Sequence, residues 1–384
     1  MAYGDRLTKG RLGAALRGLG PATRMALAAT RSRFDDRTPT PRGPYVQGVS
    51  ATSATIAWVG EAAGAGRVEY GRTPELGCTA SDLRPDRRHA VALSDLLPGS
   101  TYHYRVEENG GSPATGSFRT APANEESEFA FAVIGDSGDG GMAQMAVAGL
   151  LERSMPDLVL HTGDVVYPSG KQRHYDRRFF APYRRLIRRV PIFPVLGNHD
   201  VKTGDGTAYL TNFHLPFDDP RSGGRYYSFD WGSIHFVALD SELYHGDSGG
   251  DKAEQKAWLE RDLCATTLSW KVVFLHRPLY SSSRHGGDCE VREDLEPVFV
   301  RHGVDLVFSG HDHCYERTVP IEGVTYVVSG GGGKKLYPAG ESAWTARSAS
   351  AHHAVFVHAA RERLVLEALE PDGNVLDGFE PDRG

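Results

Sequence analysis

The chain has 384 residues, which is long enough for two domains, and it contains no apolar run near the roughly 20 residues that a membrane-spanning helix needs. Its 45 glycines and 22 prolines are typical of a loop-rich globular protein. The formal net charge of −6 excludes a globally basic nucleic-acid-binding protein, while a local basic patch stays open.

Residues 1–40 are predicted to form a basic leader that is either flexible or helical. The segment before Asp35 contains seven lysines and arginines and a single acidic residue. Arg17 and Arg24 interrupt any apolar core of a signal peptide, and no twin arginine is present, so the sequence carries no clear export signal. A flexible leader or a helix packed on the main body is favoured over an amphipathic helix on an anionic surface.

Residues 41–122 alternate polar and apolar side chains between turn signals, which is typical of short β-strands. Trp58 ends one expected strand and faces a core, and a turn at 97–101 precedes another strand at 102–106. About 80 residues of this kind predict a small β-sandwich. Because no catalytic motif is visible in it, this unit is interpreted as a scaffold or an interface.

Strands alternate with helical stretches from residue 123 to residue 384, as in proteins with layers of helices on β-sheets. Asp251 has capping-box spacing and predicts the start of a helix, and a second helix is expected over 290–302. Residues 226–239 are expected to form a hairpin.

Five short motifs each follow an apolar run of strand length. Such runs are typical of strands buried on both faces, and a polar residue just beyond one lies at the carboxyl edge of the sheet, where open α/β proteins build their sites. A single Asp or His there is most often a cap or a surface group, but five such elements in order are much harder to explain that way. The motifs are Gly-Asp-Ser-Gly at 135–138, Gly-Asp-Val-Val-Tyr at 163–167, Gly-Asn-His-Asp at 197–200, Phe-Leu-His-Arg-Pro at 274–278 and Gly-His-Asp-His at 310–313. They offer enough oxygen and nitrogen ligands to hold two metal ions side by side.

This ordered set resembles the calcineurin-like metallophosphoesterases, and Tyr167 in the second motif narrows the resemblance to the purple acid phosphatases. The string at 310–317 is similar to the larger members of that family, and the resemblance covers residues 40–384. It implies an α+β multidomain protein. A small fibronectin-III-like β-sandwich over 41–122 would precede a four-layer α/β/β/α metallophosphoesterase domain over 123–384.

The resemblance also implies which residues bind metal. One ion would be Fe(III) and the other Fe(II), Zn(II) or Mn(II), and a phenolate on Fe(III) would give a purple colour. The residue types agree with this, because carboxylate and phenolate oxygens suit a hard trivalent ion, whereas an Asn-His-His set suits a softer divalent one. The first ion would be bound by Asp136, Tyr167 and His313, the second by Asn198, His276 and His311, and Asp164 would bridge the two.

Such a site implies hydrolysis of phosphate monoesters by in-line attack of a metal-bound hydroxide. The leaving alcohol then needs a proton or a positive neighbour. His199, which follows the ligand Asn198, is the first candidate, and Asp200 is expected to orient its ring. His285 resembles the site histidine that follows the fourth motif of the family, with a solvated loop residue as the alternative.

Three further features are interpreted as structural. Residues 330–335 fail the P-loop template and are expected to form a tight glycine turn near the site. The basic stretch 171–189 is expected to be a solvated helical face, with steering of an anionic substrate as the alternative. Cys314 is expected to be a small buried filler, and a pairing of Cys264 with Cys289 stays open.

A phosphatase acting on a small phosphorylated substrate is therefore the favoured function. The alternative is a phosphodiesterase or nucleotide hydrolase on the same site, because substrate choice lies in the expected loops 201–225 and 281–289. A non-catalytic binding module is disfavoured, since no ligand position is missing. No nucleic acid or transmembrane segment is expected, and a homodimer stays open. The sequence alone favours a cytoplasmic location, whereas the resemblance favours a secreted or periplasmic one.

Overall fold

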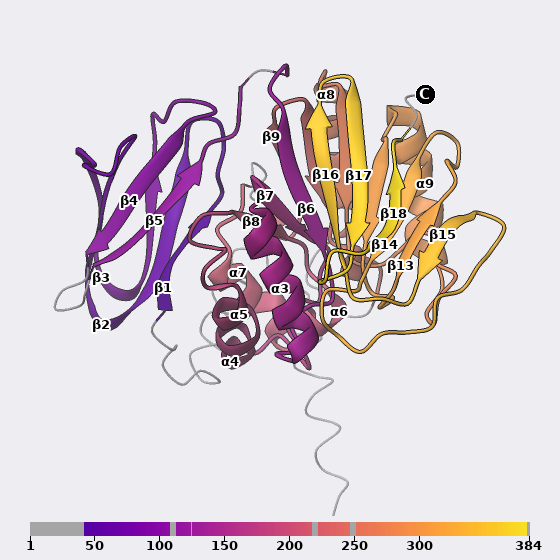
Figure 1. The fold of residues 1–384 in the computed structure, drawn as a ribbon, viewed down its shortest axis with the longest axis horizontal. Helices are drawn as coiled ribbons and strands as arrows, with labels where there is room; N and C mark the ends of the chain where they lie inside the picture. Colours follow the sequence, from indigo (N-terminus) through magenta and orange to yellow (C-terminus); the bar gives the residue numbers. More distant parts are fainter. Residues whose placement is uncertain (1–41, 108–112, 124, 217–221, 246–250, 382–384) are drawn as a thin grey trace, which may run out of the picture.

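The computed structural model describes residues 42–107, 113–123, 125–216, 222–245 and 251–381 (Figure 1). The basic leader expected over residues 1–40 therefore lies outside the described residues.

The first part of the chain forms an antiparallel sheet of five strands. They are β1 (Arg42–Gln47), β2 (Ala54–Gly71), β3 (Cys78–Leu93), β4 (Thr101–Glu107) and β5 (Ala114–Arg119). The long strand β2 pairs with β3 along most of its length, with β1 before the irregular pairing between Val59 and Gly66, and with β4 after it. Side chains from both halves of this sheet belong to one hydrophobic core, in which Trp58 is buried. The expectation of a β-rich N-terminal unit is confirmed.

The rest of the chain is built on two larger sheets. The six-stranded sheet has the order β18-β17-β16-β6-β7-β8, and the seven-stranded sheet has the order β15-β13-β14-β12-β11-β10-β9. Their strands are β6 (Phe129–Ile134), β7 (Leu158–His161), β8 (Ile192–Pro194), β9 (Tyr227–Trp231), β10 (Ile234–Ala238), β11 (Trp270–Phe274), β12 (Leu306–Ser309), β13 (Tyr315–Thr318), β14 (Thr325–Ser329), β15 (Thr345–Ala349), β16 (Ala354–Ala360), β17 (Arg363–Leu369) and β18 (Val375–Phe379). Strands β6, β7 and β8 are parallel, as are β10, β11, β12 and β14.

Alternating side chains of the seven-stranded sheet face two different cores, as the period of two in a strand requires. Phe236 and Phe308 meet Phe131 of the other sheet edge-on, at 5.1 and 6.4 Å between ring centroids. Their neighbours Val237 and Val307 belong instead to a second apolar cluster with residues of α8 and α9. The two sheets therefore pack face to face, with helices outside both.

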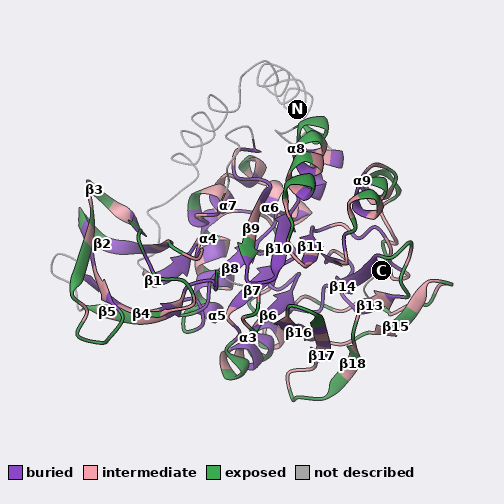
Figure 2. Ribbon diagram, turned by 90° about the horizontal axis from the view of Figure 1, so that it is seen from above, coloured by how far each residue is buried: buried purple, intermediate pink, exposed green. Residues whose placement is uncertain are grey.

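Helices complete the layers. They are α3 (Met142–Ser154), α4 (Gln172–Tyr175), α5 (Ala181–Tyr183), α6 (Asn198–Val201), α7 (Thr207–Asn212), α8 (Lys252–Ala265) and α9 (Cys289–His302). Helices α8 and α9 lie outside the seven-stranded sheet, while α3 covers the six-stranded one (Figure 2). The expected four-layer α/β/β/α arrangement is confirmed. No helix in the described ranges is long and apolar enough to cross a membrane.

Local signals in the sequence account for several element ends. The carboxylate of Asp251 accepts hydrogen bonds from the amides of Ala253 and Glu254 and caps α8. Helix α9 ends at Gly303, whose φ of 63° is the left-handed conformation that suits glycine. Strands β9 and β10 form the expected hairpin.

The N-terminal sheet packs against the basic segment 171–189. The Arg42 guanidinium lies 2.8 Å from the Asp176 carboxylate, and the Tyr104 hydroxyl donates to the carbonyl of Arg188 at 2.9 Å. On the solvent side the segment exposes five arginines, of which only Arg173 and Arg177 lie within its helical part, while the turns after α5 carry the others: Arg184, Arg185 and Arg189.

His235 on β10 makes stability depend on pH. Its Nδ1 lies 2.7 Å from Asp230 and its Nε2 lies 2.9 Å from Asp262, and only 8% of the side chain is exposed. Burial alone lowers the pKa of His235, but the hydrogen bonds and charges of the two carboxylates outweigh it and raise the pKa to about 9. The charged ring therefore stabilises the fold fully below its unfolded pKa of about 6.5, and this contribution disappears as the pH rises through about 9.

We therefore expect the His235→Gln variant to be less stable than the wild type at pH 6. This deficit in the free energy of unfolding should be roughly 2–3 kcal/mol larger at pH 6 than at pH 10. Urea unfolding of both proteins across this range measures the difference. His358→Gln, at an exposed position of β16, serves as the control and should show no such trend. A deficit of His235→Gln that stays constant with pH would contradict the assignment.

Candidate metal centre

The five motifs deliver their polar residues just beyond the ends of β6, β7, β8, β11 and β12. Asp136, Asp164 and His311 all have positive φ angles, of 55°, 49° and 68°. This left-handed backbone is unfavourable for residues other than glycine, and such strain is concentrated at functional sites. A side chain at Gly197 would lie 2.4 Å from an Asp164 oxygen, so this glycine allows two motifs to touch.

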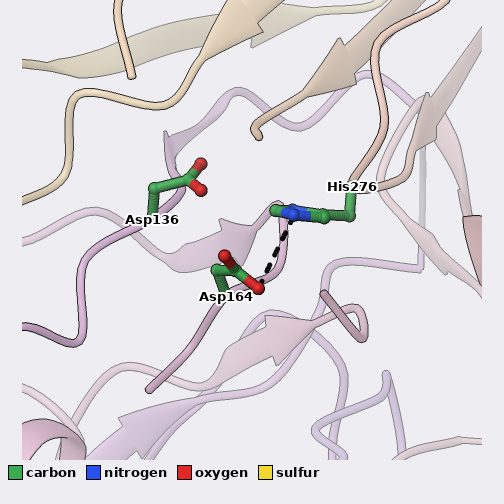
Figure 3. A group of neighbouring side chains, drawn as sticks. All are labelled: Asp136, Asp164 and His276. Carbon is green, nitrogen blue, oxygen red and sulfur yellow. Dashed lines mark ion pairs between the residues drawn. The ribbon is translucent and has the colours of Figure 1, made fainter. Parts of the chain in front are cut away.

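Asp136, Asp164 and His276 come together from three different strands. Within the described residues they form a group whose ligand atoms all lie within 4.8 Å of one another, and all three are buried. Figure 3 shows their side chains pointing toward a common space. Within it, a carboxylate oxygen of Asp164 lies 3.6 Å from Nε2 of His276. Such a buried set of two carboxylates and an imidazole suits a cation.

The side-chain nitrogen and oxygen atoms of His276, Asn198 and His311 converge on one place. The Nδ1 of His276 lies 2.9 Å from the carbonyl oxygen of Thr162, so it carries the proton and donates it, which leaves a lone pair on Nε2. That Nε2 faces the side-chain oxygen of Asn198 at 3.1 Å and Nδ1 of His311 at 3.3 Å. Two acceptors directed at each other require a cation or a proton between them, so these side chains fit a metal ion.

A second convergence involves His313, Tyr167 and Asp136. The Nδ1 of His313 lies 2.8 Å from the carbonyl oxygen of Lys335 and donates to it, so in the neutral ring the lone pair is on Nε2. That atom lies 3.1 Å from the Tyr167 hydroxyl and 3.5 Å from the Asp136 carboxylate. The Tyr167 hydroxyl donates to Asp136 at 2.9 Å. A phenol, a carboxylate and an imidazole thus share one space, and these donors fit a hard metal ion.

Burial sets the charge state of these groups. It lowers the pKa of His276 to about 4, so the ring is neutral at neutral pH, which is the form that binds metal. Burial also raises the pKa of the Tyr167 hydroxyl, and the neighbouring carboxylates Asp136 and Asp164 raise it further. Burial likewise raises the pKa of Asp164. Metal ions would reverse the last two effects, because positive charge favours the deprotonated forms.

His199 lies beside this group. Its ring is 4.5 Å from the ring of Tyr167 and its Nε2 is 3.9 Å from the Asp164 carboxylate. About a quarter of its side chain is exposed, so it can meet a molecule arriving from solvent. The Nδ1 of His199 is 2.8 Å from the carbonyl oxygen of Pro168 and donates to it.

The expectation that Asp200 orients the His199 ring is wrong. The Asp200 carboxylate is fully buried and accepts hydrogen bonds from the amides of Val165 and Gly197 and from the Tyr175 hydroxyl. These three groups use the hydrogen-bonding capacity of the Asp200 carboxylate. The His199 ring instead donates its hydrogen bond to the carbonyl of Pro168. Only the hydrogen bond from the Gly197 amide is local, because Asp200 lies in the first turn of α6 and caps the helix start. The Val165 amide and the Tyr175 hydroxyl come from segments distant in sequence.

His285 also lies close to the candidate ligands. Its ring centroid is 4.5 Å from that of His311, and its amide donates to Asp312 at 2.9 Å. The Ser281 hydroxyl donates to the other oxygen of Asp312 at 2.6 Å. The buried Asp312 therefore fixes the loop that carries His285. In the sequence, the only indication of this role is that Asp312 lies between the two histidines of the fifth motif.

Other groups that sequence reasoning missed are backbone carbonyls. Those of Thr162, Lys335 and Pro168 fix the orientation of three imidazoles, but a carbonyl is common to every residue and leaves no signal in the sequence. The side chain of Tyr337 stacks on His313 at 4.1 Å between centroids and was also not anticipated.

The glycine stretch and the cysteines are structural. A side chain at Gly330 would lie 2.1 Å from the Asp312 carbonyl oxygen, so the run 330–333 packs too closely for any side chain.

Cys314 is buried, and this burial raises the pKa of its thiol to about 12, as expected for a filler. Cys264 and Cys289 are free thiols.

Comparison with known proteins agrees with this geometry. Residues 129–315 match the family model described as calcineurin-like phosphoesterase. Purple acid phosphatase 15 of Arabidopsis thaliana is 31% identical over 299 residues, which covers 64% of this chain and 54% of that protein. Acid phosphatase type 7 of Homo sapiens is 30% identical over 254 residues, covering 61% of this chain and 57% of that protein.

A solved structure has the same fold. Purple acid phosphatase PPD1 from seeds of yellow lupin (Lupinus luteus) superimposes with a TM-score of 0.78 at 21% identity, covering 89% of this chain and 74% of that one. The chain spans little more than half the length of the two curated relatives named above.

Proposed function

We propose that this chain, which carries a calcineurin-like phosphoesterase domain and is homologous to the purple acid phosphatases, hydrolyses phosphate monoesters at a two-metal centre. The substrate would be a small phosphorylated molecule, which water splits into an alcohol and inorganic phosphate. The observation that carries this proposal is the convergence of unshared electron pairs at two neighbouring places in the same buried group.

In this proposal each place holds one ion, and Asp164 contributes to both. It is buried and its carboxylate lies 3.6 Å from Nε2 of His276, while its other neighbours include His199. Asp136 and Tyr167 would supply oxygen ligands to an Fe(III) ion, and an Fe(II), Zn(II) or Mn(II) ion would take the nitrogen-rich side. The proposed ligands of one ion are Asp136, Tyr167 and His313, and those of the other ion are Asn198, His276 and His311.

When bound, two such ions supply Lewis acidity, which offsets charge on the phosphoryl oxygens and makes water a better nucleophile. The protein supplies orientation and a proton. In the reaction, the attacking water gives up one proton to solvent and its oxygen forms a bond to phosphorus. The ester P–O bond breaks and the departing oxygen takes up a proton, which leaves an alcohol and hydrogen phosphate. His199 is placed to provide this proton, because its Nε2 lies 3.9 Å from Asp164 and part of its ring is exposed. His285, beside His311, would contact the same phosphate or its leaving group.

We expect the purified protein to release inorganic phosphate from phenyl phosphate, and prolonged chelation to lower the rate at least ~100-fold, because the metal ions supply several kcal/mol of transition-state stabilisation. Adding back iron together with zinc or manganese should restore the rate. Phosphate release is followed colorimetrically, with circular dichroism as the control that the chelated protein stays folded. Full activity in the metal-free protein would exclude the proposed mechanism.

A further inference from the structure

A row of aromatic rings crosses the candidate metal centre. The ring of His199 lies 4.5 Å from that of Tyr167, Tyr167 lies 6.0 Å from His313, and His313 stacks on Tyr337 at 4.1 Å. The middle members Tyr167 and His313 are buried, with 2% and 5% of each residue exposed. The end members His199 and Tyr337 are partly exposed, so the ends of the row form the rim around the buried donors.

Each end of this row carries an exposed cation. The ammonium of Lys202 lies 3.0 Å from both ring nitrogens of His199. At the other end the guanidinium of Arg284 lies over the Tyr337 ring, 5.0 Å from its centroid. Within the described part of the chain, neither forms an ion pair with a carboxylate. Neither contact cancels the positive charge, because a neutral imidazole and a phenol ring carry no net negative charge.

A third cation at the site behaves differently. Lys334 lies 4.9 Å from the centroid of the Tyr167 ring, but its ammonium is also 2.7 Å from the Asp139 carboxylate. That carboxylate offsets its charge, so of these three cations Lys202 and Arg284 are the two without a carboxylate partner among the described residues.

We propose that Lys202 and Arg284 select phosphate esters whose alcohol portion carries a further negative charge, such as a carboxylate or a second phosphate. This inference rests on the proposed phosphatase function. With the phosphate at the buried ligand atoms, the alcohol portion of the ester would lie at the exposed rim, where its negative group meets the cation at one end of the row or the other. Neutral leaving groups gain nothing from them.

The test compares two substrates with the same reacting group, phenyl phosphate and 3-carboxyphenyl phosphate, in the metal-loaded full-length protein. The wild type should have the higher kcat/KM for the carboxylated ester. In the double variant Lys202→Gln/Arg284→Gln the ratio of the two kcat/KM values should fall about 5- to 10-fold, as expected for losing charge pairs near a protein surface. Lys202→Glu should lower the ratio further, because it replaces attraction with repulsion.

Arg72→Gln is the matched control, because Arg72 is an exposed arginine between β2 and β3 of the N-terminal sheet. It should leave the ratio unchanged. An equal loss on both substrates in the double variant would mean that the two residues merely support His199 and Tyr337, and it would overturn the inference alone. No phosphate release from either substrate by the wild type would overturn the proposed function and the inference together.

Discussion

Asp164→Asn should lose both metal ions and at least about 10³-fold of the proposed phosphatase activity, since the carboxylate that we propose to bridge the two ions is replaced by a neutral amide. Asparagine has nearly the same shape and tolerates the left-handed backbone at this position, where φ is 49°. The amide oxygen can still accept the hydrogen bond that the His199 amide donates to Asp164 at 2.7 Å. The loss should therefore come from charge and not from unfolding.

Metal content by mass spectrometry and kcat/KM for phenyl phosphate measure this prediction. Asp95→Asn is the control, because Asp95 also has a positive φ, of 58°, but lies in an exposed turn of the N-terminal sheet. It should keep both ions and full activity. Retention of one full metal equivalent by Asp164→Asn would argue against a bridging role.

His199→Ala should keep its metal ions but lose about 10²- to 10³-fold in kcat, as expected when a general acid is removed. The ring hydrogen-bonds to the Pro168 carbonyl and lies tilted against the Tyr167 ring, but it is not part of the ligand set of either proposed metal position. The loss should be larger for phenyl phosphate than for 4-nitrophenyl phosphate, because the better leaving group needs less protonation.

The split between metal content and kcat separates this role from a structural one. A metal content that falls as steeply as kcat would leave the general-acid role unsupported, and so would equal losses on the two substrates. His199→Gln is a useful companion, since it keeps a polar side chain next to Lys202 but cannot transfer a proton.

The sequence predicted the architecture where local chemistry and burial agree. The apolar runs before Asp136 and His276 are buried strands. In every motif except that of His276, a glycine precedes the ligand and allows the close contacts that join the motifs, as at Gly135 and Gly197. These features are encoded within a few residues, so a periodic pattern and a turn signal are enough to detect them.

Features that depend on contacts between distant segments were not predictable. Asp200 follows His199 in the chain, yet its carboxylate turns inward to amides that lie about 35 positions away. The carbonyls that orient His276 and His313 belong to residues distant in sequence, and so does Tyr337 on His313. Long-range packing decides these contacts, and one sequence without its fold does not report them.

The most direct test of the two-metal account is the metal content of the purified wild-type protein after growth with iron, zinc and manganese supplied. We predict two metal equivalents per chain, at least one of them iron, because oxygen-rich and nitrogen-rich donors converge at two neighbouring places. A protein that binds one equivalent or none, while remaining folded by circular dichroism, would contradict the account.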